Sequence, residues 1–124
     1  MSGRRRVYQI GERIKELVAQ YLVHTADPRF NLVTITSVMV SPDLRIAKVY
    51  WVVSFVSGVD RDERIAEVVE AFESAQGYFR RMISKQLGIR FVPDLRFYYD
   101  DTLDTVEQVE RLMEKIKPSE NQES

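Results

Sequence analysis

The chain of 124 residues contains no cysteine, and its single histidine is His24. The absence of cysteine excludes disulfides, zinc ribbons, iron–sulfur ligation and thiol catalysis. A site built from two histidines of one chain is excluded as well. Neither glycine-rich phosphate-loop pattern, G-x-x-x-x-G-K-[ST] or G-x-G-x-x-G, is present. The sequence therefore predicts no catalytic residue, no metal site and no cofactor.

Long hydrophobic runs are also lacking. Met1 to Arg6 are polar and basic, and no apolar run behind them could act as a signal peptide or span a bilayer. We therefore expect a cytoplasmic protein with no membrane partner, and a monomer by default. Hydrophobic residues make up 44% and charged residues 30% of the chain, as in globular proteins. The length predicts a single domain over residues 1–117 and a disordered polar tail over residues 118–124.

The charges of the two signs are segregated along the chain. The net charge of -1 is unusual for a protein that binds nucleic acid. Residues 1–59 nevertheless carry eight Lys/Arg against four Asp/Glu, and residues 74–99 carry five against one. Residues 60–73 carry two against six, and residues 100–124 carry three against eight. This distribution permits a basic face, although solvated helix surfaces without a partner remain the alternative.

The first half of the chain predicts a helix followed by a β-hairpin. Apolar residues at helical spacing predict an amphipathic helix over 7–22, which Asp27-Pro28-Arg29 terminates. Two β-branched, alternating segments, 32–40 and 45–55, are separated by a turn sequence and predict antiparallel strands. In the first strand, one face is expected to carry Val33, Ile35 and Met39. In the second strand, we expect the buried face to consist of Ala47, Val49, Trp51 and Val53.

The second half predicts a long helical pattern, a third strand and a final helix. Asp60 is placed to cap a helical pattern that extends to Gly88 and contains Gly77. We expect a kink at Gly77 that joins two shorter helices, while a tolerated glycine in one helix is the alternative. The segment 95–99 predicts a strand. A short C-terminal helix is expected to dock through Leu103, Val106, Val109, Leu112, Met113 and Ile116.

This order of elements predicts an α+β domain with helices packed on one side of a three-stranded sheet. A kink would expose backbone N–H groups where a phosphate can bind. Arg80, Arg81 and Lys85 follow the expected kink, and Arg90 comes shortly after. The N-terminal run Arg4, Arg5 and Arg6 could add phosphate contacts, or it could be only a mobile basic tail. The pair Asp100 and Asp101 could hold a cation, but such a pair more often caps a helix.

The chain resembles a known family in the order and spacing of several short motifs. The order helix-strand-strand-helix-kink-helix-strand is similar to the type II KH domain, an RNA-binding module, with Ala75-Gln76-Gly77 in place of its GXXG loop. These three residues resemble bacterial ribosome-binding factor A, together with Arg6-Val7 and the helix after it, the segments 27–29, 33–38, 41–44, 47–50, 77–80, 87–90 and 92–97, and Asp100. The resemblance extends from Arg6 to Ile116, and the C-terminal tail is short for this family.

The resemblance implies a non-catalytic assembly factor that binds the small (30S) ribosomal subunit. Such a factor assists late maturation and 5'-end processing of 16S rRNA and matters most in the cold. RNA is expected to bind along the kinked helix pair, at Ala75, Gln76, Gly77, Arg80, Arg81, Lys85 and Arg90, with Arg4, Arg5 and Arg6. Two alternatives remain: a protein-interaction or small-ligand regulatory domain, and a metal-assisted nuclease, which the lack of a larger carboxylate cluster disfavours.

Overall fold

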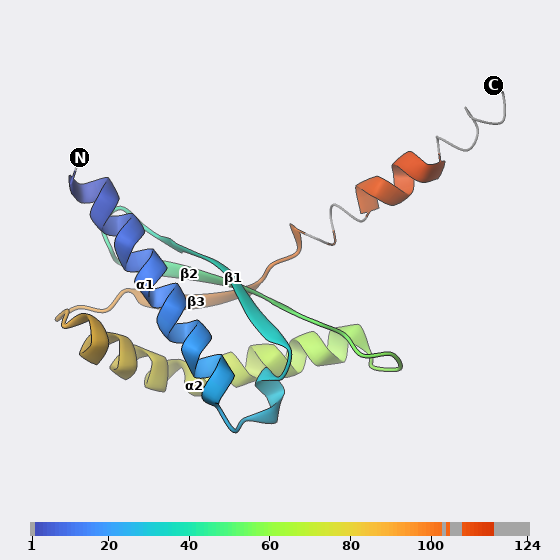
Figure 1. Cartoon of the computed structure of the whole chain (residues 1–124), viewed down its shortest axis with the longest axis horizontal. Helices are drawn as coiled ribbons and strands as arrows, with labels where there is room; N and C mark the ends of the chain where they lie inside the picture. The colour runs from blue at the N-terminus through green and yellow to red at the C-terminus, as the bar shows by residue number, and fades with distance from the viewer. Residues whose placement is uncertain (1, 103, 105–107, 116–124) are drawn as a thin grey trace.

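The computed structural model describes residues 2–102, 104 and 108–115. Figure 1 shows two long helices and a three-stranded sheet, and the order of elements matches the α+β class predicted from the sequence. The elements are α1 (Ser2–His24), the short 3-10 helix η1 (Pro28–Phe30), β1 (Val33–Val40), β2 (Ile46–Val53), α2 (Arg61–Leu87) and β3 (Asp94–Tyr99).

Strand β2 lies in the centre of the sheet. Its neighbours are β1, which runs antiparallel, and β3, which runs parallel. The predicted hairpin of β1 and β2 is therefore confirmed. A parallel pair needs a long crossover connection, and α2 provides it between β2 and β3.

The core lies between one face of the sheet and the two long helices. The face of β2 predicted to be buried is confirmed, because Ala47, Val49, Trp51 and Val53 are all at most 5% exposed. Helix α2 contributes Phe72, whose ring stacks on that of Phe97 with centroids 4.4 Å apart and lies 5.6 Å from the ring of Trp51. The other buried apolar side chains of these two helices are Ile14, Leu17 and Val18 of α1 and Val68, Ala71, Ala75, Phe79 and Ile83 of α2.

A β-bulge makes the prediction for Met39 wrong. The pairing of β1 with β2 shifts between Ile35 and Ser37, which leaves Thr36 without a partner in the ladder. Because side chains alternate along a strand, one extra residue moves every later side chain to the other face. Ile35 is therefore buried, whereas Met39 is 62% exposed. The Thr36 hydroxyl donates a hydrogen bond to Asp100 Oδ2 at 2.7 Å, so that the bulge is tied to the end of β3.

Helix α2 is one continuous helix, so the predicted division into two shorter helices at Gly77 is wrong. The backbone remains helical from Arg61 to Leu87. A helix-interior glycine costs roughly 1 kcal/mol relative to alanine. Burial of the flanking residues Ala75 and Phe79 against the sheet exceeds that cost, because one large apolar side chain alone gains about 1.5–3 kcal/mol on burial.

The predicted caps of α2 are confirmed at both ends. At the start, Asp60 Oδ1 accepts a hydrogen bond from the backbone N–H of Glu63 at 3.0 Å. At the end, Gly88 adopts the left-handed conformation with φ of 62°. Its N–H donates to the carbonyl of Ser84 at 3.0 Å, which closes the last turn.

The C-terminal helix does not dock as predicted. Residues 108–115 are helical, and Figure 1 shows them away from the sheet. The side chains of Val109, Leu112 and Met113 are each more than half exposed. The inner face of the sheet is already covered by α1 and α2, which leaves no core surface for a third helix. Leu103, Val106, Ile116 and the tail 118–124 lie outside the described residues.

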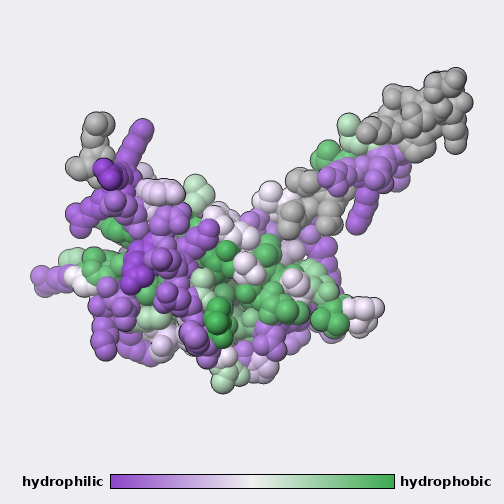
Figure 2. All heavy atoms as spheres, in the orientation of Figure 1, coloured by the Kyte–Doolittle hydropathy of each residue, from purple (hydrophilic) through white to green (hydrophobic). Residues whose placement is uncertain are grey.

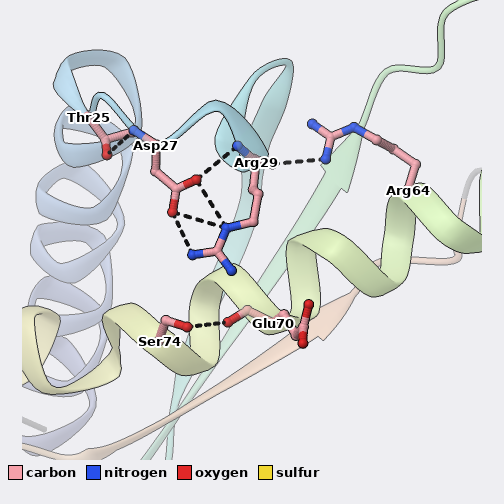
Figure 3. A network of polar contacts seen from close by, with 6 residues as sticks. All are labelled: Thr25, Asp27, Arg29, Arg64, Glu70 and Ser74. Atoms are coloured by element: carbon pink, nitrogen blue, oxygen red, sulfur yellow. Dashed lines mark hydrogen bonds and ion pairs between the residues drawn. The ribbon is translucent and has the colours of Figure 1, made fainter.

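A polar network fixes the corner between α1 and β1 (Figure 3). Asp27 ends the helical path as predicted, and its carboxylate accepts hydrogen bonds from the Arg29 backbone N–H at 3.0 Å and from Arg29 Nη2 at 2.7 Å. Arg64 of α2 donates to the backbone carbonyls of Arg29 and Asn31 at 2.9 and 2.7 Å. The network therefore joins the corner to α2, next to the buried ring of Phe30.

The pKa of Asp27 is lowered, chiefly by the hydrogen bond from the Arg29 side chain. A carboxylate with a lowered pKa stabilises the fold at pH values above its usual pKa of 3.8. This contribution is lost as the pH falls through the lower pKa of the folded state. Asp27→Asn should lower the free energy of unfolding at neutral pH by about 1 kcal/mol and flatten its pH dependence below about pH 4. Urea denaturation across pH measures both effects.

Glu73→Gln is the control for the Asp27 variant, because it removes an exposed carboxylate of α2 that makes no hydrogen bond or ion pair among the described residues. Glu73→Gln should leave the free energy of unfolding unchanged at every pH. If Asp27→Asn and the unaltered protein had the same free energy of unfolding across pH, a stabilising role for the network would be contradicted.

Candidate nucleic-acid interface

A groove of about 890 Å³ opens at the end of the molecule where four segments of the chain meet. These are the first turns of α1, the β1–β2 turn, the C-terminal part of α2 and the α2–β3 loop, which Figure 1 shows together at the left. A smaller hollow of about 350 Å³ adjoins it, because Arg80, Arg90 and Val92 line both. Figure 2 shows hydrophilic side chains gathered towards this end, while hydrophobic ones gather on the other half of the same face.

The two hollows, which together we call the basic groove, are strongly basic. Only two acidic side chains line them, those of Asp43 and Asp94. The basic side chains that line them, which we call the basic set, are Arg6, Arg45, Arg80, Arg81, Lys85 and Arg90. Among the described residues, of the basic set only Arg45 makes an ion pair, with Asp43 at 3.8 Å and with both side chains exposed. Asp94 forms an ion pair at 3.2 Å with Arg96, which is not one of these basic residues. Five cations therefore face solvent without neutralisation.

The β1–β2 turn presents Arg45 to the groove. The Ser41 hydroxyl and the Arg45 backbone N–H both donate to Asp43 Oδ1, at 2.7 and 3.1 Å. These bonds lower the pKa of Asp43, the one from Ser41 most, and keep its carboxylate occupied within the turn. Leu44 has φ of 61°, a left-handed conformation that costs a leucine roughly 1–2 kcal/mol. The hydrogen-bonded turn holds this residue, and Leu44 forms part of the groove wall.

The α2–β3 loop presents Arg90. Gly88 reverses the chain direction at the end of α2, and the Ser84 hydroxyl donates to the carbonyl of Ile89 at 3.3 Å. The Arg90 guanidinium lies 5.4 Å from the ring centroid of Phe91, which is itself 78% exposed. An exposed arginine beside an exposed aromatic ring can contact both phosphates and bases.

The structure brings together most of the basic residues predicted for RNA binding. Arg6, Arg80, Arg81, Lys85 and Arg90 all line the basic groove. Arg4 and Arg5 are exposed on the first turns of α1, not on an extended tail, and they do not line it.

Ala75, Gln76 and Gly77 form a turn of α2, so no second helix begins here with free backbone N–H groups for a phosphate, and RNA binding by these three residues stays a prediction. Ala75 is buried. The side-chain amide of Gln76 donates a hydrogen bond to the backbone carbonyl of Leu95 at 2.9 Å, which attaches α2 to β3. Gly77 is exposed, and a Cβ built there would meet only Arg81 Nη1, at 3.4 Å. These three residues therefore position the C-terminal half of α2.

Arg45 and Leu44 belong to the site although sequence reasoning did not select them. The turn containing them was predicted, but its place beside the α2–β3 loop depends on β2 and β3 being parallel neighbours. A basic residue directly after a tight turn is a weak signal that could have identified Arg45.

Neither a metal centre nor a membrane span stands out in the described residues. No group of three or more His, Cys, Asp or Glu side chains is arranged to hold an ion in that part of the chain. Asp100, one half of the pair considered above, accepts hydrogen bonds from Thr36 and from the backbone of Thr102. Within the same residues, no helix combines the length and hydrophobicity that crossing a bilayer requires.

Known proteins share this fold and much of this sequence. The family model described as Ribosome-binding factor A matches residues 6–113. A protein of that name from Citrifermentans bemidjiense is 36% identical over 116 residues, which are 93% of each chain. A solution structure of a Thermotoga maritima protein described as a ribosome binding factor A is 33% identical with a TM-score of 0.61, over 73% of this chain and 82% of that one.

A third similar protein is the Thermus thermophilus factor, in a homology model fitted into the cryo-electron microscopy map of its complex with the 30S subunit. It is 19% identical, with a TM-score of 0.56 over 76% of this chain and 94% of that one. The fold and the groove together define a small α+β domain of the KH-like class with a basic surface. Within that class, the chain belongs to the ribosome-binding factor A family.

One glycine within α2 and the glycine that caps its C-terminus allow a matched test of how the helix positions the groove. Gly77→Ala should raise the free energy of unfolding by about 0.5–1 kcal/mol, because the position is helical and open. Gly88→Ala should lower it by about 1–2 kcal/mol, because its φ of 62° is unfavourable for alanine. Thermal denaturation followed by circular dichroism measures both. Destabilisation by Gly77→Ala would instead indicate that a kink is required.

Proposed function

We propose that this protein is a cytoplasmic ribosome assembly factor that binds the small ribosomal subunit through the basic groove, without catalysing a reaction. Its task would be to assist late maturation of the subunit and processing of the 5' end of 16S rRNA, with most effect in the cold. Membership of the ribosome-binding factor A family supports ribosome binding. The resemblance noted from the sequence supports the choice of subunit and the finer role.

The observation that carries the proposal is the group of unneutralised cations in the basic groove. Arginine and lysine side chains that neutralise phosphates supply most of the affinity of proteins for nucleic acids. Cations drawn from α1, the β1–β2 turn, α2 and the α2–β3 loop surround a space of about 890 Å³. Such a concave arrangement fits a folded RNA backbone better than a flat basic surface would, and it does not require base reading.

Binding of this kind would stabilise one arrangement of the RNA during assembly. The groove walls belong to elements that share one core, so the spacing of the cations is set by the fold. A rigid array of charges selects RNA conformations whose phosphates match it. We infer that the protein holds an RNA element in an immature position until assembly proceeds, which requires no chemistry.

The first test is co-sedimentation of the purified protein with isolated small subunits, large subunits and joined ribosomes over a salt series. Selective binding to small subunits that weakens with salt is expected. Equal binding to all three particles would contradict the choice of subunit. Binding that does not depend on salt would favour a protein-interaction domain in place of RNA recognition.

Charge reversal tests the groove itself. Arg80→Glu combined with Arg81→Glu should weaken small-subunit binding roughly tenfold or more and reduce the salt dependence, because two phosphate contacts are lost. Both side chains are exposed, so the melting temperature should change little. Arg4→Glu combined with Arg5→Glu makes the same charge change outside the groove and should have the smaller effect. Wild-type affinity of the Arg80 and Arg81 double variant would refute the assignment.

A further inference from the structure

The outer face of the sheet, opposite α1 and α2, carries an unusual set of side chains. The parallel register places Tyr50 beside Tyr98 and Lys48 beside Arg96. The two tyrosine rings have centroids 5.8 Å apart and are inclined by 37°. Tyr98 is 40% exposed, and no helix of the described chain packs on these four residues. We call them the outer-face quartet.

Folding stability does not account for the two adjacent cations of the outer-face quartet. Like charges directly opposite each other on neighbouring strands are destabilising, and Lys48 and Arg96 are such a pair. Arg96 is partly compensated by Asp94 at 3.2 Å, but both side chains are about half exposed, so this ion pair is well screened. Lys48 makes no ion pair among the described residues. Two tyrosines left partly in water also gain less than buried ones.

The chemistry of the outer-face quartet fits unpaired nucleotides. Exposed aromatic rings on a sheet stack on nucleobases, and flanking cations bind the phosphates between them. We propose that the outer face of the sheet binds a single-stranded RNA segment, with Tyr98 and Tyr50 stacking on bases and Lys48 and Arg96 contacting the backbone. This inference rests on the proposed function, to which it adds a second RNA site for unpaired nucleotides.

The outer-face quartet begins a few residues from the basic groove along β2 and β3. Arg45 and Asp94 line the groove, and they precede Lys48 by three residues and Arg96 by two. At about 3.3 Å per residue, these separations are roughly 10 Å and 7 Å. A single-stranded RNA segment that leaves a folded RNA element in the groove can therefore reach the two tyrosines within a few nucleotides.

Asp94 and Asp100 flank the outer-face quartet at its two ends. Asp94 is paired with Arg96 at the end nearest the groove. Asp100 follows β3 at the other end, where Thr36 and Thr102 donate hydrogen bonds to its carboxylate. The carboxylate at that end repels a phosphate chain, so the backbone is expected to follow the Lys48 end of the face.

The test is fluorescence anisotropy of a labelled oligouridylate, which has no base pairing, with a fully paired, blunt-ended RNA duplex as the second probe. Tyr50→Leu combined with Tyr98→Leu should weaken oligouridylate binding by about fivefold to a hundredfold while duplex binding stays within twofold. Tyr50→Phe combined with Tyr98→Phe retains the rings and should restore binding. Tyr8→Leu changes a tyrosine of α1 that is 67% exposed and should have no effect.

Separate readouts distinguish the failure of this inference from the failure of the proposed function. Unchanged oligouridylate binding by the folded leucine variant, or equal loss with phenylalanine, would overturn the stacking site even if small-subunit co-sedimentation persists. Loss of subunit binding by the wild-type protein would refute the proposed function instead. If the leucine double variant does not fold, Tyr98→Leu alone and Lys48→Glu are the replacements, and each should weaken the oligouridylate complex at least threefold.

Discussion

The packing of α2 across the inner face of the sheet is the constraint on which the rest of the structure depends. Its centre is the contact of Phe72 with Phe97, whose rings stack 4.4 Å apart, with Phe79 5.4 Å from the same Phe97 ring. Aromatic contacts of this kind add about 0.5–1.5 kcal/mol each beyond the burial of their surface. They fix where along the sheet α2 lies, and therefore where its last turns end.

The basic groove follows from that position. Because α2 ends beside the start of β3, the loop after it returns next to the β1–β2 turn and the first turns of α1. Cations from segments far apart in the sequence thus surround one hollow, although the whole chain has a net charge of -1. Covering only one face of the sheet has a second consequence, since the opposite face stays open with its tyrosines and cations.

The places where sequence patterns failed have one kind of cause. Helical and strand periodicities describe a segment by itself, and they predicted the limits of β2 and the cap at Asp60 well. The exposed Met39 could not be predicted, because the bulge at Thr36 is tied to Asp100, which is distant in the sequence. The continuity of α2 at Gly77 was likewise decided by the burial of residues on either side of it. The docking surface expected for the C-terminal helix was already occupied.

For the candidate site, the basic residues themselves could be identified from the sequence, since charge segregation marked the segment 74–99. Their grouping could not, because Arg6 and Arg45 join Arg80 and Arg90 only after the strands are ordered. The sequence by itself determined the class of fold, the buried face of β2 and the residues available to bind an anion, because these depend on local periodicity and composition. Only the tertiary structure decided which of those residues share a surface, because that depends on contacts between distant segments.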